Sequence, residues 1–292
     1  MSGAVRRAKL PVPAARRLPR RWIIVGVAAL CLFLFADFLI ASFPYNDALA
    51  RLLSPYQLKL AYQEQHLSLP IGVELERVEL FSTAAKPDRL LLQSPAVALA
   101  PVITSFILGK PRLRLHARLY GGSVRATVRQ AVDVLYTDFQ LENLSLAESQ
   151  PLRQFGILLG GDVSGTGSAN LNAGDLITDN GDARLVGANV TLEITRGFPR
   201  IRLGAVSGNL ELAGGVVTLD ELVTHGGDVE AKADGEIQLA PDLAESTIAA
   251  RVYLTPTPSG RDHFGILFNM LPHPPGEGPY YLSGRLASPS IK

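Results

Sequence analysis

Two parts of the sequence contain residue types that could perform chemistry, and the first is the glycine-rich run GGDVSGTG at residues 160–167. Glycines at this density can cradle a phosphate through backbone N–H groups when a helix follows them. The run lacks the GK[ST] ending of a phosphate-binding loop, and no helical pattern follows it. We therefore expect a strand or a bulge at these residues.

Histidine and cysteine often hold metal ions, but neither forms a recognisable site here. The five histidines show no HExxH motif and no close pairing, and Cys31 is the single cysteine. The sequence contains no G-x-S-x-G nucleophile elbow, and no grouping of acid, base and nucleophile stands out. We therefore expect a protein that is not an enzyme and that needs no metal or other cofactor.

The second part is a basic hairpin with strict alternation. In residues 112–120 apolar side chains alternate with basic ones, and Gly121-Gly122 is typical of a two-residue turn. Residues 123–129 alternate back with the same two faces. The apolar face is a candidate groove for an apolar ligand, and it comprises Leu113, Leu115, Leu119, Val124 and Val128.

The opposite face of this hairpin is a candidate surface for an anionic partner. A turn at Gly121-Gly122 predicts two arginine pairs, Arg114 with Arg129 and Arg118 with Arg125. Like charges in direct opposition destabilise a sheet unless something compensates them. Either acidic side chains on an adjacent strand neutralise the arginines, or the arginines bind an anion such as a lipid headgroup or an acidic partner. The acids of the first interpretation are Glu74, Glu76 and Glu79.

Most of the chain after residue 44 alternates in the same way. Turn signals such as Asn180-Gly181 and Gly214-Gly215 separate the alternating segments. Short strands joined by tight turns favour an elongated antiparallel β-sheet, so the expected fold class is mainly β. Beyond the basic hairpin, strands are expected at Ala183–Ile194, Ile201–Leu212, Val216–Val223, Val229–Leu239, Thr247–Leu254 and Tyr280–Leu286.

Two or three short helices are expected beside the strands. Capping residues, prolines and helical spacing indicate helices at Asp47–Leu53, Pro101–Leu108 and 151–159, and a weaker turn at Phe264–Met270. The expected domains after the N-terminal segment are an αβ and hairpin unit at 44–150 and an antiparallel meander at 151–292.

The N-terminal segment combines a basic tail with an apolar run. Residues 1–21 hold seven basic side chains and no acid, and residues 22–43 contain only one charge. A helix over that run would span about 33 Å, enough to cross a bilayer core of about 30 Å. The positive-inside rule then predicts a cytoplasmic tail and a body outside the cytoplasm. The expected anchor contains the aromatic residues Trp22, Phe33, Phe35, Phe38 and Phe43.

A cleaved signal peptide is the alternative to a retained anchor. Its cleavage sites after Ala36 or Ala41 would place a leucine three residues upstream, where a small residue is preferred. We therefore expect a single-pass transmembrane helix.

Composition limits the classes of partner. Hydrophobic residues make up 47% of the chain and charged residues 19%, which excludes a disordered chain. Outside the basic tail the chain contains 21 basic and 27 acidic residues, which gives a net charge of −6. We therefore expect no binding to nucleic acid.

An ordered set of motifs resembles a known family. The motifs are Phe43-Pro44-Tyr45 with the following helix, the strand Ile71–Leu80, the helix Pro101–Leu108 leading into Gly109-Lys110-Pro111 and the hairpin, and Gly278–Leu286 before Pro289. Their order resembles the type II secretion system protein N family, in the form seen in delta-type proteobacteria, and the broader AsmA-like group. The resemblance covers residues 40–290 and transfers no catalytic residue. It implies a single-pass inner-membrane protein with a curved β-sheet body, open along one apolar side.

The expected function is therefore that of a non-enzymatic accessory component of the type II secretion apparatus. Its partners would be the inner membrane and other secretion components, which its periplasmic body would contact. The alternative is an AsmA-like module that binds or transfers lipid through an apolar groove. A periplasmic hydrolase is a third interpretation, but the sequence contains no hydrolase motif.

Overall fold

A computed structural model describes most of the chain beyond residue 48. Contacts divide the chain into two units, Met1–Phe43 and Pro44–Lys292, and of the first unit the structure describes Cys31 alone. The described residues are 31, 49–50, 53–68, 72–83, 88–102, 104–105, 112–131, 134–154, 158–172, 179–193, 199–240 and 245–292.

Fifteen strands of the second unit form one antiparallel sheet. Both β1 and β2 pair with β3, and from β3 to β15 every strand pairs with the next one along the chain. The mainly β, antiparallel fold class is therefore confirmed. The strands are β1 (Leu58–Ala61), β2 (Glu64–Leu67), β3 (Val73–Ser82), β4 (Arg89–Pro101), β5 (Arg112–Leu119), β6 (Gly122–Ala131), β7 (Val134–Ser145), β8 (Leu158–Asn172), β9 (Asn180–Glu193), β10 (Ile201–Ala213), β11 (Val216–His225), β12 (Val229–Gln238), β13 (Thr247–Pro256), β14 (Tyr280–Arg285) and β15 (Ser288–Ile291).

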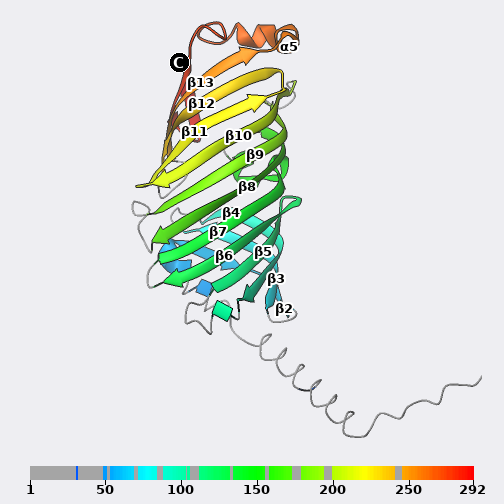
Figure 1. Cartoon of the computed structure of the whole chain (residues 1–292), viewed down its shortest axis with the longest axis vertical. Helices are drawn as coiled ribbons and strands as arrows, with labels where there is room; N and C mark the ends of the chain where they lie inside the picture. The colour runs from blue at the N-terminus through cyan, green and yellow to red at the C-terminus, as the bar shows by residue number, and fades with distance from the viewer. Residues whose placement is uncertain are drawn as a thin grey trace, which may run out of the picture. The chain divides into compact units, whose positions relative to one another are not determined.

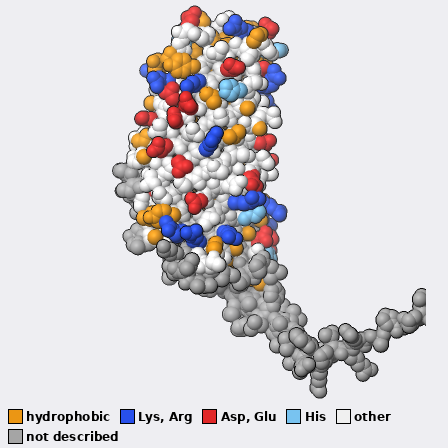
Figure 2. Space-filling model, viewed as in Figure 1, with side chains coloured by type: hydrophobic (Ala, Val, Ile, Leu, Met, Phe, Trp, Pro, Cys, Tyr) orange, Lys and Arg blue, Asp and Glu red, His pale blue; other side chains and the backbone are white. Residues whose placement is uncertain are grey.

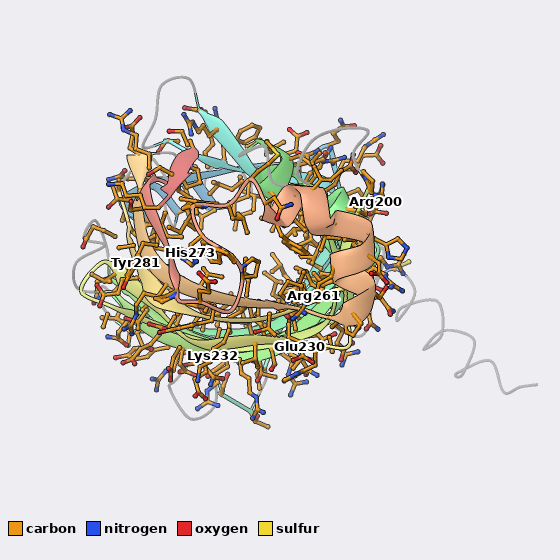
Figure 3. All side chains as sticks on the ribbon, turned by 90° about the horizontal axis from the view of Figure 1, so that it is seen from above. Arg200, Glu230, Lys232, Arg261, His273 and Tyr281 are labelled. Atoms are coloured by element: carbon orange, nitrogen blue, oxygen red, sulfur yellow. The ribbon has the colours of Figure 1, made fainter. Side chains whose placement is uncertain are left out.

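The sheet is strongly curved, and residues in left-handed backbone conformation lie within its strands. Asn143, Asn189 and Glu221 have φ of 52°, 52° and 47°, and the strand pairing shifts register beside each of them. Such bulges bend a strand and increase its twist. In Figure 1 the strands rise obliquely from β3 to β13 with β4 behind the front layer, and Figure 3 shows the sheet curling around an inner side.

The glycine-rich run forms part of β8 and not a loop. Gly161 has φ of 98° at a register shift between β8 and β9, which is a bulge. Gly165 and Gly167 pair with Leu185 and Ala183 in the ladder. The expectation of a glycine-bearing strand is thus confirmed, and the strand continues beyond the run to Asn172.

Two clusters of fully buried apolar residues lie at opposite ends of the strand order. One cluster, on β3 to β5, contains Leu75, Val78, Val97 and Ala117. The other contains Ile201 of β10, Val229 of β12 and Phe264, which lies on the helix α5 (Pro258–Phe268). Figure 1 shows α5 beyond β13 at that end of the sheet.

A capping residue connects α5 to the backbone of Asp228, whose buried carboxylate is held by Arg202 of β10. The Thr257 hydroxyl caps the helix by accepting from the Gly260 N–H and donates to the Asp228 carbonyl oxygen. The Asp228 carboxylate, 2% exposed, accepts from Arg202 through both the backbone N–H (3.0 Å) and the guanidinium (2.7 Å). This hydrogen bonding by Arg202 lowers the pKa of Asp228 against the opposing effect of its burial.

The other helices differ from expectation at their ends. The helix α4 (Gln150–Gln154) is shorter than the expected 151–159, because Leu158 already begins β8. Pro101 ends β4 instead of starting a helix; residues 104–105 are helical, and 106–108 lie outside the described residues. Within 47–53, the described residues 49, 50 and 53 are helical. Two 3-10 turns, η1 (Ser54–Tyr56) and η2 (Leu146–Glu148), complete the described helical elements.

The junction between residues 150 and 151 lies in the connection between β7 and β8. These two strands pair directly, and Pro44–Lys292 is one compact unit. The ranges 44–150 and 151–292 therefore share one sheet.

Candidate functional site

Strand register separates the charged from the apolar side chains of the sheet. Leu115, Ala126 and Phe139 pair with one another across β5, β6 and β7, and we call the face of the sheet that carries them the inner face. On the described strands β5 to β14, no residue of this face is charged. The intervening positions form the outer face, where Figure 2 shows acidic and basic side chains scattered among uncharged ones. In Figure 3, Glu230 and Lys232 of β12 project away from the inner side.

The inner face of the middle strands is covered only in part. Leu185 of β9 and Leu210 of β10 are both half-buried, whereas the end clusters contain residues such as Leu75 and Val78 that are 1% exposed. Among the described helical elements, η1 contacts β1, η2 contacts β8, α4 contacts β4 and β8, and α5 contacts β13. A half-buried, uncharged strip thus runs along β6 to β11.

Glycines within this strip leave room beside the larger side chains. A Cβ placed on Gly167 would lie 2.5 Å from the Phe139 ring, and one on Gly165 would lie 2.7 Å from Leu185. The aromatic ring and the leucine therefore lie over bare backbone on the neighbouring strand. Side chains at these two glycine positions would displace the Phe139 ring and Leu185, so the strip stays flat because these residues are glycines.

All five residues of the candidate apolar groove lie on the inner face. Leu113 pairs with Val128, and Ala117 pairs with Val124. Leu115 and Val124 pack against the cluster on β3 to β5, and Leu119 is 6% exposed, while Leu113 is 40% exposed. These residues therefore extend from the buried cluster to the edge of the half-buried strip.

All four candidate arginines lie on the outer face, but their expected pairing is wrong. Arg114 pairs with Thr127, Arg118 pairs with Ser123, and the arginines in direct opposition are Arg112 and Arg129. The cause is the turn, which consists of Tyr120 and Gly121 (φ of 47° and 74°), while Gly122 already belongs to β6. A two-residue turn with positive φ at both positions is the type that matches the twist of a hairpin.

The acidic neighbour of the arginines also differs from expectation. Glu74, Glu76 and Glu79 lie on β3, which β4 separates from β5. The acid that pairs is Glu142 of β7, whose carboxylate accepts from Arg125 at 3.0 Å. Arg129 lies over the Tyr136 ring, 4.3 Å from its centre, in a cation–π contact. Neighbouring strands thus compensate part of the positive charge.

A depression of about 580 Å³ lies among the outer-face side chains of this region. Arg114, His116 and Arg125 border it on the basic side, and Asp138 and Gln140 border it on β7. Its rim carries both signs of charge.

One further cluster was not expected from the sequence. His66 Nε2 lies 3.5 Å from a carboxylate oxygen of Glu64 and 3.5 Å from one of Glu76. One imidazole and two carboxylates are ligand types that zinc accepts, but Arg77 already neutralises Glu64 at 2.9 Å. The cluster joins β2 and β3 through the Glu64–Glu76 pair, so only knowledge of the strand register could have indicated it.

The aromatic residues of the expected anchor, Trp22, Phe33, Phe35, Phe38 and Phe43, lie outside the described residues. Within the part of the chain that the structure describes, no helix combines the length and the apolar character needed to cross a bilayer.

No family model, curated protein or solved structure matches this chain.

Proposed function

We propose that the chain is a non-enzymatic accessory component of the type II secretion apparatus, anchored in the inner membrane by residues 22–43 with its β-sheet body in the periplasm. The observation that carries the binding role is the uncharged, half-buried inner face of β6 to β11. The secretion role itself follows from the family resemblance of the ordered motifs in residues 40–290.

The chemistry of the inner face supports binding and not catalysis. General acid and base catalysis needs titratable groups at the reacting atoms, and the inner face of the described strands β5 to β14 offers no charged side chain. Covering apolar surface is favourable by about 25 cal/mol per Å². A partner that covers this face would therefore gain from the contact without any directional bond.

An AsmA-like lipid-binding or lipid-transfer role is the second candidate, and one specific observation favours it. The inner strip continues across neighbouring strands with glycines that keep its relief low, as at Gly165 and Gly167. An acyl chain is flexible and uncharged and needs no hydrogen-bond partner, so it fits a strip of this kind. Under this proposal the ligand would be lipid and the membrane its source.

Photo-crosslinking from adjacent positions distinguishes the two candidates. Leu185 faces inward and Val186, 49% exposed, faces outward on the same strand. A photoreactive amino acid at 185 in the full-length protein should label a secretion component under the first proposal and lipid under the second, while the same group at 186 serves as the control. Equal labelling from both positions would contradict a role for the inner face.

Secretion itself tests the first proposal. Deleting the gene should stop export of substrates of the type II apparatus, and normal export would sink this proposal while leaving lipid binding open.

A reporter fused after residue 60 tests the membrane orientation. The seven basic residues of the tail predict activity in the periplasm alone. Activity of the same fusion in the cytoplasm would refute the orientation.

A further inference from the structure

A pocket of about 610 Å³ lies where the β5–β6 turn meets the connection between β7 and β8. Its lining comes from β3, β4, the end of β5, the β5–β6 turn, the start of β6, η2 and α4, so it joins distant parts of the sequence. Three of the lining residues are arginines, Arg77, Arg118 and Arg153, and the single acid among them is Glu148. The pocket therefore concentrates positive charge.

Hydrogen bonds hold the walls of this pocket together. The Ser145 N–H donates to the Tyr120 carbonyl oxygen at 2.8 Å, which joins the end of β7 to the turn. The Gln150 side-chain amide donates to Gln93 Oε1 at 3.0 Å, which joins α4 to β4. The pocket is thus bounded by elements that bond to one another.

Two of the arginines retain capacity to bind an anion. Arg77 already donates to Glu64 at 2.9 Å. Arg153 donates to a neutral acceptor, the Glu148 backbone carbonyl oxygen, at 3.0 Å. Arg118 forms no ion pair within the described ranges.

Tyr120 supplies a second, independent observation. Its backbone has φ of 47° at the first turn position, where asparagine and glycine are favoured and a tyrosine is strained. Its hydroxyl is buried and stands in good hydrogen-bonding geometry to no group of the described chain. Burial raises the pKa of this hydroxyl, and the nearby groups that oppose the rise, the Gln150 backbone amide and Arg153, are both donors.

The group that the hydroxyl lacks is therefore an acceptor. The Gln150 backbone N–H and the Arg153 guanidinium can only donate, so neither can accept the hydroxyl hydrogen, and no group of the described residues accepts it. A buried polar group without a partner is unfavourable, so an acceptor that enters the pocket would gain from both the hydroxyl and the guanidiniums.

We propose that this pocket binds a phosphate group, held by Arg118 and Arg153 with the Tyr120 hydroxyl as a further donor. A phosphate suits it because it carries up to two negative charges and three strong acceptor oxygens, which arginine can contact in a bidentate manner. Arg114 and Arg125 border the other depression and do not line this pocket. The proposal does not depend on what covers the inner face.

The test measures binding of inorganic phosphate to the full-length protein in detergent by isothermal titration calorimetry. Arg118→Gln and Arg153→Gln should each weaken binding by about tenfold or more, since each removes a charge-assisted contact. Arg114→Gln is the matched control, because it removes the same charge from the same strand outside the pocket, and it should leave binding unchanged.

The Tyr120→Phe variant distinguishes phosphate binding at this site from a general effect of the protein's charge. It keeps the ring and the overall charge, so it should weaken phosphate binding without lowering the thermal stability of the unliganded protein. Unchanged phosphate affinity in both arginine variants would overturn the proposal, as would equal weakening by Arg114→Gln.

The source of the phosphate is resolved with vesicles. Co-sedimentation with phosphatidylglycerol vesicles that depends on Arg118, with phosphatidylcholine vesicles as the comparison, would assign the site to an anionic lipid headgroup. Phosphate binding without vesicle binding would assign it to a soluble phosphate. Failure to bind either probe would refute the site.

Discussion

The α5 end of the sheet and its middle strands bury their apolar residues in different ways. At the α5 end, Phe264 closes over Ile201 and Val229, and Asp228 joins the helix to the sheet. In the middle, Phe139 and Leu185 lie over glycines and stay half-buried. The comparison teaches that one continuous ladder can bury its apolar residues fully at an end and leave an apolar surface half-covered in its centre.

The largest expected effect comes from truncating the core at the α5 end. Phe264→Ala should lower the free energy of unfolding by about 3 kcal/mol or more, because it opens a cavity in a closed cluster. Phe139→Ala is the matched change in the middle and should cost clearly less, since its ring is already partly exposed. Urea unfolding followed by circular dichroism measures both, and equal losses would remove the distinction between the regions.

Breaking the Asp228 ion pair should come next. Asp228→Asn should destabilise the α5 end by about 2 kcal/mol at neutral pH, because hydrogen bonds to a charged group are lost in a buried setting. Proteolysis of the 257–270 region should become faster as the stability of the α5 end falls. Normal stability of the variant would show that Thr257 and Phe264 hold the helix by themselves.

The same pair predicts a pH dependence. The folded pKa of Asp228 is lowered by Arg202, so its contribution is present above the unfolded value of about 3.9 and is lost as the pH falls through the folded pKa. The wild-type protein should therefore lose more stability than Asp228→Asn when both are titrated from about pH 5 downward. Parallel curves for the two proteins would contradict this role.

A change in the middle should affect binding more than stability. Leu185→Gln should reduce binding of a neutral apolar dye such as Nile red severalfold, with a cost of about 1 kcal/mol or less in unfolding, because the side chain is half-exposed. Val186→Gln on the outer face should leave dye binding intact. Loss of folded protein from Leu185→Gln would place this strand in the core instead.

The smallest expected effect concerns the outer face. Arg112 directly opposes Arg129, so Arg112→Glu should stabilise the hairpin by a few tenths of a kcal/mol. Arg184→Glu is the control, because its cross-strand neighbours, Thr166 and Asn209, are uncharged. The gain should shrink as salt rises. Destabilisation by Arg112→Glu alone would indicate that the basic face is needed for folding.

Alternation along the sequence was sufficient to predict the strands β5, β6 and β9 to β14 and the two faces of the basic hairpin, but not β4 or β7. Arg112 to Tyr120 and most later segments form strands within two or three residues of expectation. Side-chain alternation has a period of two, so a wrong turn that shifts the pairing by two residues still gives correct faces, as happened at Gly121-Gly122. The pairs across the hairpin were wrong for the same reason.

Features that depend on distant strands could not be predicted in this way. The bulges at Asn143 and Glu221 interrupt alternation without a turn signal, and Glu142 became the partner of Arg125 only through the order of the strands. The α5 helix did carry a local signal, since Thr257-Pro258 combines a capping residue with proline at the first helical position. The turn expected at Phe264–Met270 overlaps only the second half of this helix.

The meander has a consequence for how the body is made. From β3 onward each strand bonds to the strand that follows it, so no strand there waits for a partner synthesised much later. Contacts that are local in sequence need little loop closure and form early. The chain can therefore form its sheet hairpin by hairpin in the order of its synthesis. Folding would advance from β3 toward β13 and α5, and β14 and β15 would add last.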